Sequence, residues 1–120
     1  MEAIAFCPAH VTGFFKAHID TNETVLENLG STGAGFSIKQ GVTTTVKIDI
    51  KNNGGENFKI ITKGYKSDKT DISEYVLHEF LKLGKFSDLF FNIEHEITIP
   101  VGYGLGSSSA VALSLAFALD

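Results

Sequence analysis

The sequence of 120 residues contains no arginine, although it has ten lysines, and its formal net charge is −4. Proteins that bind duplex nucleic acid normally present a basic stripe in which arginine side chains contact phosphates and bases. The composition therefore argues against a duplex-binding surface. It leaves open a local anion site, because the N-terminus of a helix binds anions through its backbone N–H groups.

Cysteine and long apolar stretches are also scarce. Cys7 is the single cysteine, which excludes an internal disulfide framework and is typical of a protein in a reducing cytosol. No apolar run reaches the roughly 18 residues of a membrane-spanning helix, and the first residues lack the basic start of a signal peptide. We therefore expect a soluble, cytoplasmic protein of one domain.

Hydrophobic periodicity predicts several strands. Residues 3–9 and 11–15 are expected to form two short strands separated by a bend, because Pro8 interrupts the first apolar run. The alternation over residues 42–50 predicts a strand with one apolar face. A strong turn signal follows at residues 52–55, so residues 58–62 are expected to return as its partner strand. Residues 30–35 are rich in glycine and are interpreted as a loop.

Two helices are predicted further along the chain. Asp71 stands three residues before Glu74 in a capping-box-like start, and apolar residues then follow at helical spacing as far as Leu83. A strand alternating from Phe91 to Ile99 precedes a second helix that is apolar almost all round, a pattern of burial on several sides. This order indicates an α+β fold with a mostly antiparallel sheet.

The segment between that strand and the last helix carries the strongest chemical signal. Gly102, Gly104 and Gly106 alternate and are followed by three serines. Glycine accepts positive φ and lets a ligand approach the main chain, and a helix that begins at the serines would direct its N–H groups at an anion. No lysine follows Gly106, which excludes a Walker A motif, and Ser107 takes the place of the third glycine of a dinucleotide-binding fingerprint.

The pattern from Pro100 to Ala110 resembles the phosphate-binding motif of the GHMP kinases, a family that includes galactokinase, homoserine kinase and mevalonate kinase. The resemblance implies a ribosomal protein S5 domain 2-like fold with the helices on one face of the sheet. It also implies that ATP and Mg²⁺ are the cofactors and that Ser108 contacts the metal. The serines are expected to cap the following helix. The implied residues for the ATP phosphates are Pro100, Gly102, Gly104, Leu105, Gly106, Ser107, Ser108 and Ser109.

The first residues resemble one archaeal branch of that family, whose members phosphorylate pantoate on the route to coenzyme A. The residues that carry this resemblance run from Cys7 to Phe15 and from Gly30 to Gly35. The resemblance implies a catalytic role for His10, in place of the basic residue that other members use. It further implies an acceptor side that consists of Thr12, Ser31, Gly33 and Gly35.

Several expectations follow from the resemblance. Residues 1–120 would be the N-terminal, ATP-binding domain of a longer kinase, inactive without a second domain, and the apolar last helix would favour self-association. The alternatives are a family member with another acceptor (mevalonate, homoserine, shikimate or a sugar), a non-catalytic S5-like binding module, or a purely structural fragment. The absence of arginine weighs against an RNA-binding module.

Overall fold

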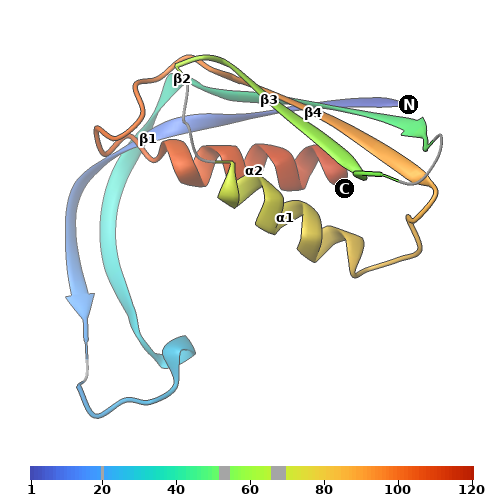
Figure 1. Ribbon diagram of the computed structural model, residues 1–120. Helices are drawn as coiled ribbons and strands as arrows, with labels where there is room; N and C mark the ends of the chain where they lie inside the picture. The colour runs from blue at the N-terminus through green and yellow to red at the C-terminus, as the bar shows by residue number, and fades with distance from the viewer. Residues whose placement is uncertain (20, 52–54, 66–69) are drawn as a thin grey trace.

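A computed structural model describes residues 1–19, 21–51, 55–65 and 70–120 of the chain. The elements, in chain order, are β1 (Glu2–His18), the 3-10 helix η1 (Leu26–Asn28), β2 (Gly30–Ile50), β3 (Phe58–Gly64), α1 (Asp71–Leu81), β4 (Leu89–Ile97) and α2 (Ser107–Leu119). The sheet has four strands in the order β1-β2-β4-β3. Both helices lie on one face of the sheet (Figure 1), and two of the three strand pairings are antiparallel. The predicted fold class is confirmed.

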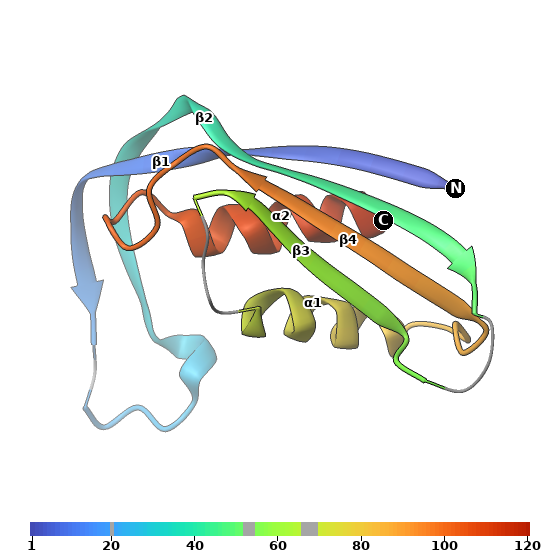
Figure 2. The same cartoon turned by 45° about the horizontal axis from the view of Figure 1, so that its top comes forward.

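The strands β1 and β2 extend beyond the body of the molecule as a curved two-stranded ribbon (Figures 1 and 2). The prediction of two short strands in residues 3–9 and 11–15 is wrong, because β1 runs through Pro8 with register shifts at Pro8/His10 and Thr12/Phe14. Proline is tolerated here because β1 is an edge strand. The glycine-rich segment 30–35 is likewise part of β2 and not a loop.

The partner predicted for residues 42–50 is also wrong. Strand β3 does not pair with β2 but runs parallel to β4, which lies between them. The predicted turn at residues 52–55 lies mostly outside the described residues. Parallel neighbours need a crossover connection, and α1 supplies it between β3 and β4. Alternation shows which face of a strand is buried, but it does not identify the neighbouring strand.

The core lies between the sheet and the helices in two clusters. The predicted inward face of β4 is confirmed, because Phe91, Ile93, His95 and Ile97 are all buried. The larger cluster consists of Val46, Leu77, Phe91, Ile93, Leu115 and Ala118. The smaller one consists of Ala9, Val42, Ile97, Ile99 and Ala110, with Val101, Leu105 and Val111 packed against it. The second cluster thus holds both ends of the glycine-rich segment against the body.

The two helices differ in detail from their sequence patterns. Thr70, one residue earlier than predicted, is the N-cap of α1, and its Oγ1 donates a hydrogen bond to Glu74 Oε1 at 3.0 Å. Helix α2 is not buried on all sides, because Leu113 is 50% exposed and Phe117 is 70% exposed. No helix among the described residues is long and apolar enough to cross a membrane.

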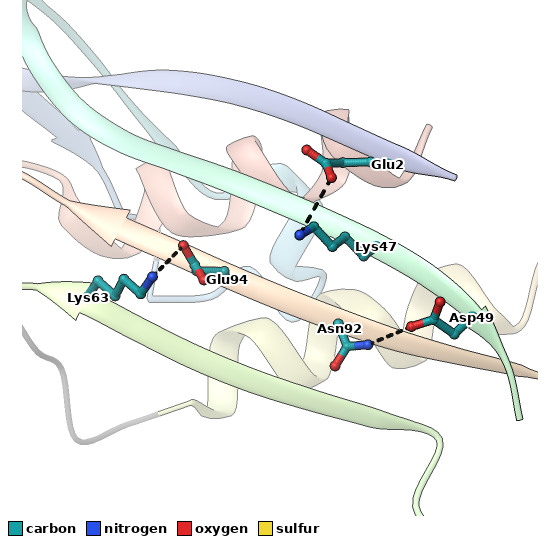
Figure 3. A network of polar contacts seen from close by, with 6 residues as sticks. All are labelled: Glu2, Lys47, Asp49, Lys63, Asn92 and Glu94. Carbon is teal, nitrogen blue, oxygen red and sulfur yellow. Dashed lines mark hydrogen bonds and ion pairs between the residues drawn. The ribbon is translucent and has the colours of Figure 1, made fainter. Parts of the chain in front are cut away.

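The sheet face opposite the helices carries charged side chains together with the exposed apolar residues Ile4, Phe6 and Ile61. Lys47 Nζ lies 3.6 Å from Glu2 Oε2 and Lys63 Nζ lies 3.2 Å from Glu94 Oε1, and each is an ion pair between neighbouring strands (Figure 3). Solvent-exposed pairs of this kind contribute about 0–1 kcal/mol each. These pairs therefore add little to stability, and the chemistry suggested by the sequence lies elsewhere, where the loop meets α2.

Candidate functional site: a glycine-rich loop at the start of α2

The loop before α2 contains three glycines in the left-handed region. Gly102, Gly104 and Gly106 have φ angles of 88°, 74° and 69°. A Cβ atom added at Gly102 or Gly104 would meet no atom within 4 Å. Glycine is therefore required there by backbone conformation and not by crowding, and the main chain of the loop stays accessible.

Helix α2 begins at Ser107 without a side-chain cap. Its N-cap is Gly106, and no side-chain hydrogen bond caps the first turn. The prediction that the serines cap the helix is wrong, because a capping side chain needs an N-cap residue in extended backbone, whereas Gly106 is left-handed. The N–H groups of the first turn thus have no side-chain partner at the cap, and such groups attract anions.

The long strands hold the loop at both ends. The backbone N–H of His10 donates to the carbonyl oxygen of Leu105 at 3.0 Å. At the other end, the N–H of Thr98 donates to the carbonyl oxygen of Gly41 at 3.0 Å, and Thr98 Oγ1 accepts from the Gly41 N–H at 3.1 Å. These contacts fix the position of the loop relative to β1 and β2.

His10 lies across the backbone of β2 next to the loop. A Cβ atom at Gly35 would lie 2.5 Å from His10 Nε2, so the imidazole occupies the place of the missing side chain. A Cβ at Gly106 would lie 3.7 Å from His10 Cβ. Thr12 is opposite Gly35 in the strand register. The structure thus places His10 beside the loop, with Gly35 against its ring and Thr12 opposite Gly35 in the neighbouring strand.

The other two predicted acceptor-side residues lie farther out on the ribbon. Gly33 is opposite Phe15, and Ser31 is opposite Ala17. At about 3.3 Å per residue, Ser31 is about 13 Å along β2 from Gly35. Both residues are exposed. The structure therefore does not bring them against the glycine-rich loop.

A small cavity of about 30 Å³ lies where the first turn of α2 faces α1 and β4. Ser107 and Ser108 line one side, and Ser73 and His95 line another. This cavity adjoins the serines that follow the glycine-rich loop.

A chain of buried polar groups runs from this cavity into the core. His95 Nε2 lies 2.8 Å from Ser73 Oγ, and His95 Nδ1 lies 2.7 Å from Thr44 Oγ1. Thr44 Oγ1 lies 2.6 Å from Ser114 Oγ, which donates to the carbonyl oxygen of Val111 at 3.2 Å. The four side chains are buried, and burial lowers the pKa of His95 to about 4.

The alternation from Phe91 to Ile99 puts His95 among the apolar residues of one strand face but gives it no role. One signal for that role was present, since His95 is the single ionisable residue among the apolar positions of that face. Its partners could not be found in the same way. They come from α1, β2 and α2, and their positions in the sequence are far apart.

The loop and the start of the helix suit a polyphosphate, whereas the described residues offer few ligands for a metal ion. Exposed main chain at Gly102 and Gly104 leads to the uncapped first turn of α2, and the Ser108 hydroxyl is exposed beside it. Among the described residues, no group of three or more His, Cys, Asp or Glu side chains could hold a metal ion. A magnesium ion would consequently rely on phosphate oxygens, the Ser108 hydroxyl and groups beyond these residues.

Comparison with known proteins points to one family. Residues 72–120 match the model of the GHMP kinases N terminal domain. A pantoate kinase of Methanocaldococcus jannaschii is 33% identical over 117 residues, which are 96% of this chain and 38% of that protein. A pantoate kinase of Methanospirillum hungatei is 27% identical over 97% of this chain and 37% of that protein. The chain thus spans a little over a third of the length of these relatives.

Solved structures show the same relationship. A phosphotransferase related to the coenzyme A biosynthesis pathway superimposes with a TM-score of 0.79 at 27% identity, over 99% of this chain and 39% of that one. Homoserine kinase from Cytophaga hutchinsonii shares the fold, with a TM-score of 0.60 at 22% identity over 98% of this chain and 34% of that one. In its sequence, its fold and the motif around its glycine-rich loop, the chain is similar to the N-terminal domain of the GHMP kinases.

Proposed function

We propose that the chain is the N-terminal, ATP-binding domain, residues 1–120, of a cytoplasmic kinase that transfers the γ-phosphoryl group of ATP to the primary hydroxyl of pantoate and releases ADP and 4-phosphopantoate. The observation that carries the proposal is the loop itself, in which three left-handed glycines lead into an uncapped helix beside His10. The similarity to two pantoate kinases over nearly the whole chain supports pantoate as the acceptor.

In this proposal the loop binds and orients the nucleotide. The N–H groups of Gly104, Gly106, Ser107 and Ser108 would contact the phosphates, with the positive end of the α2 dipole directed at their charge. A magnesium ion, when bound, would neutralise charge on the phosphates, and Ser108 is the residue of this chain that would contact it. Phosphoryl transfer needs little covalent chemistry from the protein, so positioning of this kind is a large part of catalysis.

The acceptor would approach from the side of β1. His10 lies next to Gly106, where its imidazole could donate a hydrogen bond to a substrate carboxylate or accept one from the reacting hydroxyl. Thr12 and Gly35 lie beside it. Ser31 and Gly33 would contact the acceptor only if it extends along the ribbon, or if a second domain brings it there.

The experiment that tests this proposal uses the protein expressed from the complete gene. Transfer of radioactive phosphate from γ-labelled ATP is measured with pantoate, mevalonate, homoserine and shikimate as acceptors, and the chain of residues 1–120 is assayed in parallel. We expect pantoate to be phosphorylated in preference to the other acceptors and the short chain to be inactive. Preference for another acceptor would overturn the specificity, and pantoate phosphorylation by residues 1–120 alone would overturn the need for a second domain.

A further inference from the structure

We propose that the buried hydrogen-bond chain Ser73–His95–Thr44–Ser114 has a single direction of hydrogen bonding and holds the start of α2 in place. His95 is then a positioning residue for the nucleotide site, of which it is not itself a part. The four side chains come from α1, β4, β2 and α2, and the chain therefore joins both helices to the two central strands of the sheet. The link to the nucleotide rests on the proposed function, whereas the hydrogen bonding and its effect on α2 do not.

The direction is assigned by counting protons. We assign the Ser114 hydroxyl proton to the carbonyl oxygen of Val111, 3.2 Å away, so that Ser114 accepts from Thr44 Oγ1 at 2.6 Å, a contact whose geometry fits either hydroxyl as the donor. Thr44 has then used its proton and must accept from His95 Nδ1, which is 2.7 Å away. A neutral imidazole that donates from Nδ1 accepts at Nε2, and Ser73 Oγ donates there. His95 is thereby assigned as the neutral form with its proton on Nδ1.

The hydrogen-bond chain supports the part of α2 that adjoins the loop. Ser114 lies seven residues after Ser107, about 10.5 Å along the helix axis. Val111, which accepts the proton of Ser114, lies one turn closer to the start and lines the same cavity as Ser107 and Ser108. His95 and Ser73 line that cavity as well. Breaking one of these buried hydrogen bonds therefore weakens the support of the first turn of α2 and leaves the solvent-facing groups of the loop in place.

Two substitutions at Thr44 isolate this effect. Thr44 is fully buried and does not line the cavity. Thr44→Val keeps the branched shape, which suits a strand, and removes the hydroxyl that connects His95 to Ser114. Thr44→Ser retains the hydroxyl and is the matched control. The imidazole tautomer is read from long-range ¹H–¹⁵N spectra, and nucleotide affinity from the fluorescence of trinitrophenyl-ATP with Mg²⁺.

We expect the wild-type chain to show His95 with its proton on Nδ1, and Thr44→Val to move that proton to Nε2, where Ser73 is the remaining partner. Thr44→Val should bind trinitrophenyl-ATP about five- to tenfold more weakly, the effect of losing about one hydrogen bond. Thr44→Ser should show the wild-type tautomer and an affinity close to that of the wild type. A wild-type proton on Nε2, or a folded Thr44→Val that binds as tightly as the wild type, would overturn the proposal.

A separate measurement applies if the wild-type chain does not bind the nucleotide. That result would refute the nucleotide site of the proposed function, and amide hydrogen exchange at residues 107–110 would then decide the positioning role. Faster exchange there in Thr44→Val than in Thr44→Ser supports it, and equal exchange overturns it. If Thr44→Val does not fold, Ser114→Ala replaces it, because it breaks the same link to α2. The affinity and hydrogen-exchange outcomes then apply to Ser114→Ala, whereas its His95 tautomer should stay as in the wild type, because Thr44 is retained.

Discussion

The backbone N–H of His10 donates to the carbonyl oxygen of Leu105 at 3.0 Å, which joins β1 directly to the glycine-rich loop. The two residues are 95 positions apart in the sequence but adjacent in the fold, and the contact is made by main chain alone. The side chain of His10 thus remains available beside Gly106. This relationship places the predicted catalytic residue and the predicted phosphate loop at one site.

Gly35→Ala should displace the imidazole of His10. The new Cβ would lie 2.5 Å from His10 Nε2 and would also crowd the carbonyl oxygen of Val11, so the ring or the strand must move. We expect the complete kinase to lose most of its kcat/KM for pantoate in a steady-state assay. Gly30→Ala is the matched control, because a Cβ there meets nothing within 4 Å. Equal activity of the two variants would contradict this role of Gly35.

Gly104→Ala should destabilise the loop through backbone strain alone. Its φ angle is 74°, and a Cβ there contacts nothing within 4 Å. The left-handed conformation costs an ordinary residue about 1–2 kcal/mol, and asparagine tolerates it better. Urea denaturation should show Gly104→Ala less stable than the wild type, with Gly104→Asn between them. If Gly104→Ala were as stable as the wild type, glycine would not be required by the conformation of this loop.

The sequence predicted local patterns better than long-range neighbours. Alternation identified the inward faces of residues 42–48 and 91–97, because the period of a strand is visible in the residues themselves, whereas Ile50 at the end of the first face is 78% exposed. It could not show that β4 lies between β2 and β3, since pairing depends on segments far apart in the chain. The serines predict a side-chain cap, but the N-cap of α2 is Gly106, whose left-handed backbone does not allow one. The sequence pattern did not show this backbone conformation.

The glycines of residues 30–35 were misread for a different reason. Glycine usually marks a turn, but in β2 it allows close approach by β1, where the strand register shifts. Gly35 accommodates the ring of His10, and Gly33 accommodates Phe15. The His95 chain was beyond sequence reasoning, because its members acquire a shared role only when α1 and α2 pack on the sheet.

Ser108→Ala should weaken nucleotide binding without weakening the fold. Ser108 is exposed and does not cap α2, so its hydroxyl contributes nothing to the helix start. We expect the free energy of unfolding to change by less than about 0.5 kcal/mol, as is usual for a surface substitution. The affinity for trinitrophenyl-ATP should fall in the presence of Mg²⁺ and change little without it. A loss of stability with unchanged affinity would show instead that the serine is structural.

The free energy of unfolding should fall at acid pH because His95 is protonated more readily in the unfolded chain. Burial lowers its pKa from 6.5 to about 4 in the folded protein, so between these values the unfolded chain binds the proton more readily. The stabilisation is fully present above pH 6.5 and is lost as the pH falls toward 4, by about 3 kcal/mol in total. Urea denaturation at several pH values should show a shallower loss for His95→Asn, whose amide does not titrate. Identical slopes for wild type and variant between these pH values would contradict the assignment.

The proposed role of the glycine-rich loop and the first turn of α2 is to bind the phosphates of a nucleotide. Titration of the ¹⁵N-labelled chain with ATP and Mg²⁺, followed in ¹H–¹⁵N correlation spectra and compared with adenosine, measures this binding at the residues concerned. We expect the amides of residues 102–109 to shift most with ATP and adenosine to leave them nearly unchanged. Unchanged loop amides at saturating ATP, or equal shifts with adenosine, would contradict it.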